Sequence, residues 1–288
     1  MDIFEQADVF TPSRAVLQEE EEAAAPSASG NLRPAVCVWN KSRVRELFPE
    51  GLACGVLVIA TCPTSCALVH GIPGKQLIGS VLAPGVSLAG ISLGPEPLPS
   101  DRVCAVYTLG SSSSSSSSGS SRVLLVACQY EVARERAVAW SRAVLGQVAA
   151  GHVLVLGAIP AEQFRGQGDA SQEELLFLLR TRAAAQALPG RPAAPLLPTG
   201  TVVGGLPAAL LSHCQVRDKS AELLVAVEMV LEGRAALVEA MAAALAAVLR
   251  ARGAGQAAEA LAGAGGGAVV AAARATLGLG PGTCDVYV

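Results

Sequence analysis

The sequence is poor in aromatic and charged residues and has no excess of positive charge. Phenylalanine, tryptophan and tyrosine together make up 3% of the 288 residues, so the core has to be built from alanine, valine and leucine. Charged residues make up 16%, which is low for a fully solvated surface and favours a protein that hides part of its surface in a partner. The net charge of −3 at pH 7 gives no electrostatic footprint for nucleic acid, so we expect no nucleic-acid partner.

The sequence also lacks a recognisable leader peptide and an uninterrupted membrane-spanning run. The first residues, MDIFEQADVF, include an acid and show neither the basic nor the apolar region of a signal peptide. The longest apolar stretch, residues 221–249, is interrupted by charged residues that are costly in hydrocarbon: Glu228, Glu232, Arg234 and Glu239. We therefore expect a soluble protein of the cytoplasm, or also of the nucleus, without a membrane partner.

The eight cysteines are scattered and mostly stand among aliphatic residues, which is typical of buried, reduced thiols and not of a disulfide framework. Cys62, Cys66 and His70 follow one another at intervals of four, so on a helix they would share one face. A zinc site would need a fourth ligand, and paired Cys-x-x-Cys hooks are absent. The pattern therefore predicts small buried thiols and a surface histidine, with no metal site and no cofactor.

Composition divides the chain into a body and three polar segments. Residues 1–32 include the acidic run Glu19–Glu22 and predict a disordered tail. Residues 33–279 form one predicted domain, which contains a serine-rich, disordered insertion at 110–121. Residues 280–288 begin with a Gly-Pro-Gly break and predict a flexible C-terminal tail.

Within the body, aliphatic strands alternate with helical patterns. We predict strands at 35–39, 54–61, 103–109, 122–130, 152–159 and 222–227. We predict helices at 131–148, from the Ser171–Glu174 capping box to Pro189, after 204, and at 234–250. On the first helix, one apolar stripe is expected from Val132, Val138, Trp140, Val144, Leu145 and Val148. Together these elements predict an α/β fold, a single three-layer α/β/α-type domain with a mostly buried sheet.

A serine hydrolase is the first alternative that the motifs raise. Residues 90–94, GISLG, match the nucleophile elbow G-x-S-x-G with Ser92 as nucleophile, and His213 with Asp101 or Asp169 would complete a triad. The elbow requires a helix directly after the serine, whereas prolines follow at positions 95, 97 and 99. We therefore predict that the protein is not an enzyme.

A nucleotide-binding enzyme is the second alternative. Residues 263–268, GAGGGA, have the glycine spacing of a dinucleotide fingerprint. They follow a helical, alanine-rich stretch instead of a strand, and too little chain remains for a βαβ unit. The sequence also lacks a Walker-type motif, so the glycines indicate a loop between two helices.

The most distinctive segment is GGLPAALLSHCQV at residues 204–216. Its glycines and Pro207 suit a helix start, and one apolar stripe follows, formed by Leu206, Leu210, Leu211 and Cys214. The stretch resembles the proteasome assembly chaperone 1 family, the larger partners of the heterodimeric chaperone that builds the α-ring of the 20S proteasome. The acidic N-terminal tail, the VLLVACQY strand, the helix that carries Trp140 and the HVLVLGAI strand are similar as well. The serine-rich insertion and His213, where the family suggests a tyrosine, depart from it.

The resemblance also gives a meaning to the last three residues. Members of the family end in a hydrophobic residue, a tyrosine and one final residue, and Val286, Tyr287 and Val288 match this motif. It implies a chaperone that pairs with a second assembly chaperone subunit and binds 20S α-subunits, with the tail docking in a pocket between two of them. The terminal carboxylate would pair with a lysine, and the Tyr287 ring would supply apolar area and a polar hydroxyl. A third alternative is a generic scaffold protein whose C-terminal tail packs only on its own folded body.

Overall fold

The computed structural model describes seven stretches of the chain. They are residues 34–86, 97–109, 122–166, 176–187, 192–228, 234–262 and 266–279. All of them belong to one compact unit that begins at Pro34. The expected N-terminal tail, serine-rich insertion and C-terminal tail lie outside the described residues, so these three expectations stay predictions.

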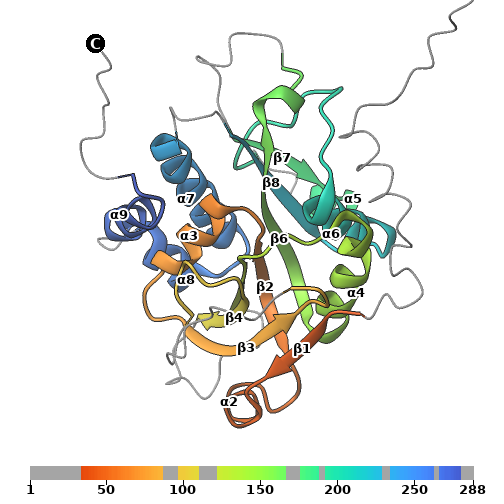
Figure 1. The fold of residues 1–288 in the computed structure, drawn as a ribbon, viewed down its shortest axis with the longest axis vertical. Helices are drawn as coiled ribbons and strands as arrows, with labels where there is room; N and C mark the ends of the chain where they lie inside the picture. Colours follow the sequence, from red (N-terminus) through yellow and green to blue (C-terminus); the bar gives the residue numbers. More distant parts are fainter. Residues whose placement is uncertain are drawn as a thin grey trace, which may run out of the picture. The chain divides into compact units, whose positions relative to one another are not determined.

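An eight-stranded sheet in the order β1-β3-β4-β5-β2-β6-β8-β7 lies at the centre of the described unit (Figure 1). The strands are β1 (Val36–Trp39), β2 (Ala53–Ala60), β3 (Gln76–Leu82), β4 (Cys104–Leu109), β5 (Val123–Cys128), β6 (Ala149–Pro160), β7 (Leu176–Arg180) and β8 (Ala221–Glu228). The neighbours β5, β2, β6 and β8 run parallel, and the outer pairs are antiparallel. All four parallel strands therefore end at one edge of the sheet, here named the carboxyl edge, at Ala60, Cys128, Pro160 and Glu228.

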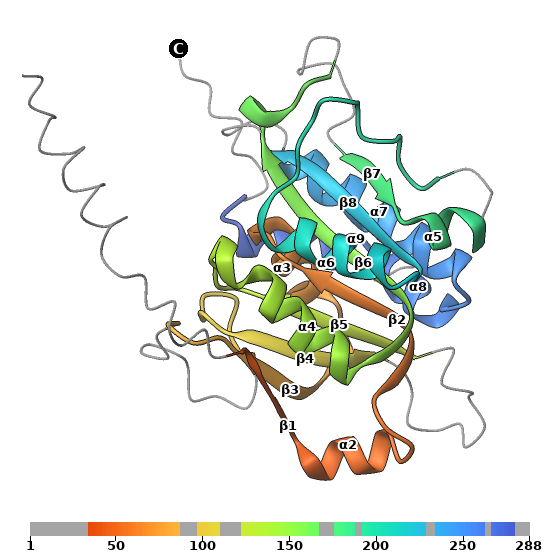
Figure 2. The same cartoon turned by 90° about the vertical axis from the view of Figure 1, so that its right-hand side faces the viewer.

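Helices cover both faces of the sheet, as Figures 1 and 2 show. On one face lie α4 (Ala137–Gln147) and α6 (Gly205–Val216), next to the short α2 (Lys41–Leu47). On the other lie α3 (Pro63–Gly71), α7 (Arg234–Ala251), α8 (Gly255–Ala262) and α9 (Gly266–Thr276). The predicted three-layer α/β architecture is confirmed. Within the described stretches, no helix combines the length and the apolar character that crossing a bilayer requires.

The two cores follow from the alternation of side chains along the central strands. In β2, Leu57 and Ile59 are buried under α4 and α6, while Val56 and Val58 are buried under the opposite helices. A strand buried on both faces has to be aliphatic throughout, which is why these runs were readable from the sequence. Small alanines allow α7 to pack closely on several sides, and its Ala242, Ala244 and Ala246 are all buried.

The helix α4 is anchored by its tryptophan. The Trp140 indole Nε1 donates a hydrogen bond to the Tyr130 hydroxyl at 3.1 Å, and that hydroxyl lies 3.0 Å from the Val81 carbonyl, to which it donates. The buried ring thus ties α4 to the end of β3, with each of its polar groups partnered. The expected stripe holds for Trp140, Val144, Leu145 and Val148, but Val138 is 50% exposed in the first turn of the helix.

The helix expected from residue 171 to Pro189 is wrong in its described part. Residues Leu176–Arg180 form the edge strand β7, which pairs antiparallel with β8, and only α5 (Arg182–Ala187) is helical. Leu176, Phe177 and Leu178 are buried, and the Leu178 amide also donates to the Pro195 carbonyl at 2.8 Å. A leucine-rich run suits either element, and pairing with β8 decides for the strand. The Ser171–Glu174 capping box lies outside the described residues.

The close packing of α3 against α9 depends on a glycine. A Cβ added at Gly71 would lie 2.7 Å from the backbone oxygen of Val269, which has no flexible end that could move aside. We expect Gly71→Ala to lower the free energy of unfolding by about 1–3 kcal/mol, because the two helices have to separate. Gly146→Ala in α4 is the control, since no atom lies within 4 Å of its added Cβ and a helical alanine is favourable. Urea unfolding of both variants measures the difference; equal stability would contradict the packing argument.

Candidate functional site

Several residues singled out from the sequence lie outside the described residues. These are the tail residues Val286, Tyr287 and Val288, the elbow serine Ser92, and Asp169. Of the glycine-rich stretch 263–268, Gly266 begins α9. The tail therefore remains a prediction from the sequence, and the described body has to be judged from its own contacts.

Two residues of the hydrolase alternative, Asp101 and His213, lie within the described residues. Asp101 is buried and accepts a hydrogen bond from the Leu98 amide at 2.8 Å. His213 lies on α6, where burial lowers its pKa and the nearby cations Arg217, Lys219 and Arg142 lower it further. Its Nε2 has no hydrogen-bond partner among the described residues. A catalytic histidine is normally oriented by a carboxylate, whereas the charged groups that shift the pKa of His213 are all cations.

Cys66 and His70 lie on the helix α3, and Cys62 directly precedes it. Cys62 is the N-cap of α3, and the thiol of Cys66 donates to the carbonyl of Cys128 at 3.3 Å. His70 is half-buried in the last turn, edge-on to the Tyr107 ring with 6.2 Å between ring centroids. In the part of the chain that the structure describes, no group of three or more potential ligands is placed to hold a metal ion.

Burial makes the described thiols poor nucleophiles. It raises the pKa of Cys37 and Cys62 to about 11, and that of Cys54 to about 12. A thiol is reactive as its thiolate, so these cysteines are inert near neutral pH. The seven described cysteines are free, as expected for reduced core residues: Cys37, Cys54, Cys62, Cys66, Cys104, Cys128 and Cys214.

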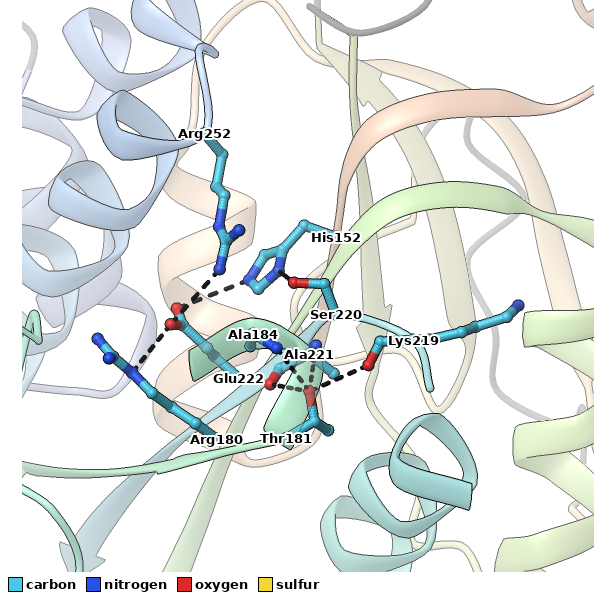
Figure 3. A network of polar contacts seen from close by, with 9 residues as sticks. All are labelled: His152, Arg180, Thr181, Ala184, Lys219, Ser220, Ala221, Glu222 and Arg252. Carbon is cyan, nitrogen blue, oxygen red and sulfur yellow. Dashed lines mark hydrogen bonds and ion pairs between the residues drawn. The ribbon is translucent and has the colours of Figure 1, made fainter. Parts of the chain in front are cut away.

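The most concentrated group of buried charges surrounds Glu222 near the start of β8 (Figure 3). One of its oxygens lies 3.1 Å from Arg180 Nε and 3.6 Å from Arg252 Nη2, while the other lies 3.6 Å from His152 Nε2. The far side of the imidazole, Nδ1, lies 2.9 Å from the Ser220 hydroxyl. We call Glu222, His152, Arg180 and Arg252 the buried ion cluster. It joins β6, β7, β8 and the end of α7.

The charges of the cluster determine its protonation. Burial disfavours the carboxylate, but the contact with His152 and the charges of Arg252 and Arg180 outweigh it and hold the pKa of Glu222 below its usual value. Burial lowers the pKa of His152, and the two guanidinium groups add to this despite the neighbouring carboxylate. At neutral pH the cluster thus holds one carboxylate, two guanidinium groups and a neutral imidazole.

The position of the cluster indicates a structural role. Glu222 and His152 stand near the amino ends of β8 and β6, opposite the carboxyl edge, where open α/β sheets bind their ligands. Beside the cluster, the Thr181 hydroxyl accepts from the Ala184 amide at 3.2 Å, caps α5, and donates to the Lys219 carbonyl at 3.0 Å. These bonds fix the end of β7 against the start of β8 (Figure 3).

Lowering the pH from about 7.5 to about 5.5 is expected to destabilise the protein partly through His152. In the unfolded chain this histidine takes up a proton near its ordinary pKa of 6.5, but in the folded chain only at lower pH, beside Glu222, Arg180 and Arg252. Because the unfolded state then binds more protons, stability is lost as the pH falls through 6.5. In urea unfolding as a function of pH, the free energy of unfolding of His152→Gln should decrease less on acidification than that of the unchanged protein. Identical slopes would show that His152 does not contribute.

Comparison with known proteins decides the family. A family model described as Proteasome assembly chaperone 4 matches residues 94–258, more than half of the chain. The chain belongs to this proteasome assembly chaperone family. The match includes the parallel strands β5, β6 and β8, and the helices α4, α6 and α7 that pack on both faces of the sheet. The resemblance noted at residues 204–216 lies inside the matched range.

The chain is similar to one named relative and to two solved structures. A protein of Xenopus laevis named Proteasome assembly chaperone 1 is 35% identical over 98 residues, which is 33% of this chain and 33% of that protein. A crystal structure of a Thermoplasma acidophilum protein of unknown function matches with a TM-score of 0.56 at 14% identity, over 83% of this chain and 91% of that one. Pyrococcus furiosus PbaB, an archaeal proteasome activator, matches with a TM-score of 0.50 at 11% identity, over 79% of this chain and 97% of that one. At these identities the two structures show the shared fold.

Proposed function

We propose that this chain promotes assembly of the 20S proteasome core as one half of a heterodimer with a second assembly chaperone. It would bind α-subunits while they form their ring, and it would act without catalysis in the cytoplasm, or also in the nucleus. The match of the family model to residues 94–258 carries the proposal. The free, buried cysteines are consistent with a reducing compartment.

The finer part of the proposal concerns the C-terminal residues. Val286, Tyr287 and Val288 would dock in a pocket between two α-subunits, with the terminal carboxylate paired to a lysine. Gly280, Pro281 and Gly282 would separate this tail from α9. Ordering a free tail costs entropy, so the tail alone would bind weakly, and the folded body would supply the remaining affinity.

A pull-down tests this function directly. The full chain, tagged at its N-terminus so that Val288 stays free, is expressed in cells that assemble 20S proteasomes, and co-purified proteins are identified by mass spectrometry. We expect a second assembly chaperone subunit and 20S α-subunits, with mature β-subunits depleted. A chain tagged after Val288 is the control, since the tag removes the free carboxylate from the motif. Absence of both partner classes from the first preparation would overturn the proposal.

A further inference from the structure

The last described residues lie at the carboxyl edge of the sheet. Helix α3 begins directly after β2, at that edge, and ends at Gly71. Gly71 packs against α9, because a Cβ added there would touch Val269 and Ala272. Helix α9 packs antiparallel to α3, so α9 ends, at Thr276, near the carboxyl edge where α3 begins. In Figure 2 the end of α9 lies on the left, the side toward which β2 and β6 point. Residues 280–288 therefore start from this side of the molecule.

The length of that segment limits where it can act. Nine residues follow Leu279, the last described one, and a fully extended chain of this length spans about 30 Å. If the tail occupies a pocket on a partner, the surface around its root has to face that partner within this distance. The carboxyl edge is this surface.

Exposed apolar side chains are present at the same edge. Leu98, Val138 and Val202 are 52%, 50% and 71% exposed. Leu98 stands beyond the end of β5, where the Gln129 side chain donates to its carbonyl at 3.0 Å. Val202 follows Thr201, whose hydroxyl accepts from the Arg165 amide at 3.0 Å just beyond β6 and its short terminal turn.

Val138 belongs to the same edge although it lies on a helix. It stands in the first turn of α4, and the preceding Arg136 donates from Nη1 to the Pro84 carbonyl at 3.1 Å, just past the end of β3. The strand β3 runs parallel to β5, because each is antiparallel to β4 between them, so its end lies at the carboxyl edge too. Leu98, Val138 and Val202 therefore lie in three separate segments that meet at the carboxyl edge. Hydrogen bonds hold the backbone beside each of them.

We infer that the carboxyl edge is the surface that this chain places on the outer face of the 20S α-ring. Leu98, Val138 and Val202 would make apolar contacts with α-subunits beside the pocket that receives the tail. The inference rests on the proposed function and adds the orientation of the body. Contacts from the edge would hold the tail near its pocket and raise its effective concentration there, which a tail on the opposite side could not achieve.

Matched charge substitutions test the orientation. Val202→Glu, the edge variant, places one carboxylate on the carboxyl edge, whereas Val216→Glu, the control, places one at the end of α6, near the amino ends of the parallel strands. Val216 is 84% exposed, so the control should fold as well as the edge variant does. Equal unfolding midpoints in urea for all chains establish that any change in binding is a surface effect.

Affinity for purified 20S particles is then measured with each full chain in complex with its partner chaperone. We expect the edge variant to bind at least about tenfold more weakly, because an unpaired carboxylate would be buried against apolar surface, and Val216→Glu to stay within about twofold. Weakening by Val216→Glu but not by the edge variant, or by neither, would overturn the orientation while the proposed function stands. If the unchanged chain does not bind, the proposed function fails and the orientation fails with it.

Discussion

Replacing Glu222 with alanine is expected to lower the free energy of unfolding by about 3–5 kcal/mol. The Glu222 side chain is 4% exposed, and its carboxylate is the shared partner of Arg180, Arg252 and His152. Its removal leaves two mostly buried guanidinium groups without a counter-charge, and water reaches them poorly. For a chain of 288 residues the loss corresponds to a decrease in melting temperature of about 5–8 °C.

An exposed ion pair elsewhere in the chain provides the control. Glu239 on α7 lies 3.4 Å from Arg274 on α9, and these side chains are 56% and 39% exposed. Because solvent screens this pair, Glu239→Ala should change stability by less than about 1 kcal/mol. Thermal and urea unfolding of both variants give the comparison. A similar small effect at the two sites would show that Glu222 is not essential to the packing around it.

A compensating variant separates loss of charge pairing from loss of packing. If the penalty comes from unpaired guanidinium groups, replacing Glu222 with leucine together with methionine at positions 180 and 252 should recover most of the stability. The methionine side chains fill a volume similar to that of the arginine stems and need no partner. Failure to recover would indicate that the hydrogen bonds and the shape of the cluster matter more than its charge balance.

The parallel centre of the fold could be predicted because each of its strands is a continuous aliphatic run. The strand β8 lies close to its predicted bounds for this reason, and the alanine-rich composition of α7 placed that helix equally well. The strand β3 was missed because Gly79 and Ser80 interrupt its apolar pattern, and a Cβ at Gly79 would meet Trp39 of β1 at 2.6 Å. A glycine is needed at position 79 because β1 packs against it, and such a contact between distant segments cannot be predicted from a local sequence pattern.

The buried ion cluster could not be predicted from the sequence. Its members come from residues 152, 180, 222 and 252, and nothing in their spacing relates them. The available signal was a single glutamate inside the apolar run of β8, together with His152 near the start of β6. A lone charge in a buried strand indicates that a partner exists, but the identity of the partner depends on the tertiary fold.

Removing Val286, Tyr287 and Val288 is expected to weaken binding to 20S particles at least about tenfold and to leave pairing with the second chaperone unchanged. Binding to the ring would lose a carboxylate, an aromatic ring and an apolar side chain at once, while the body, including the carboxyl edge, keeps its own contacts. An unchanged free energy of unfolding, measured in urea, would show that the loss of affinity comes from the tail and not from a change in the fold. Affinity measurements on the purified heterodimer give the loss.

Two further tail variants show which group is responsible. Adding one glycine after Val288 keeps every side chain but moves the carboxylate away from Tyr287, so it should cost about as much as the truncation if the carboxylate pairs with a lysine. Asp285→Asn changes the neighbouring residue outside the motif and should bind within about twofold of the unchanged chain. If the extended chain binds normally while Tyr287→Ala does not, the ring and not the carboxylate is the anchor. If none of the tail variants loses affinity, the body alone binds the ring, and the tail has no part in docking.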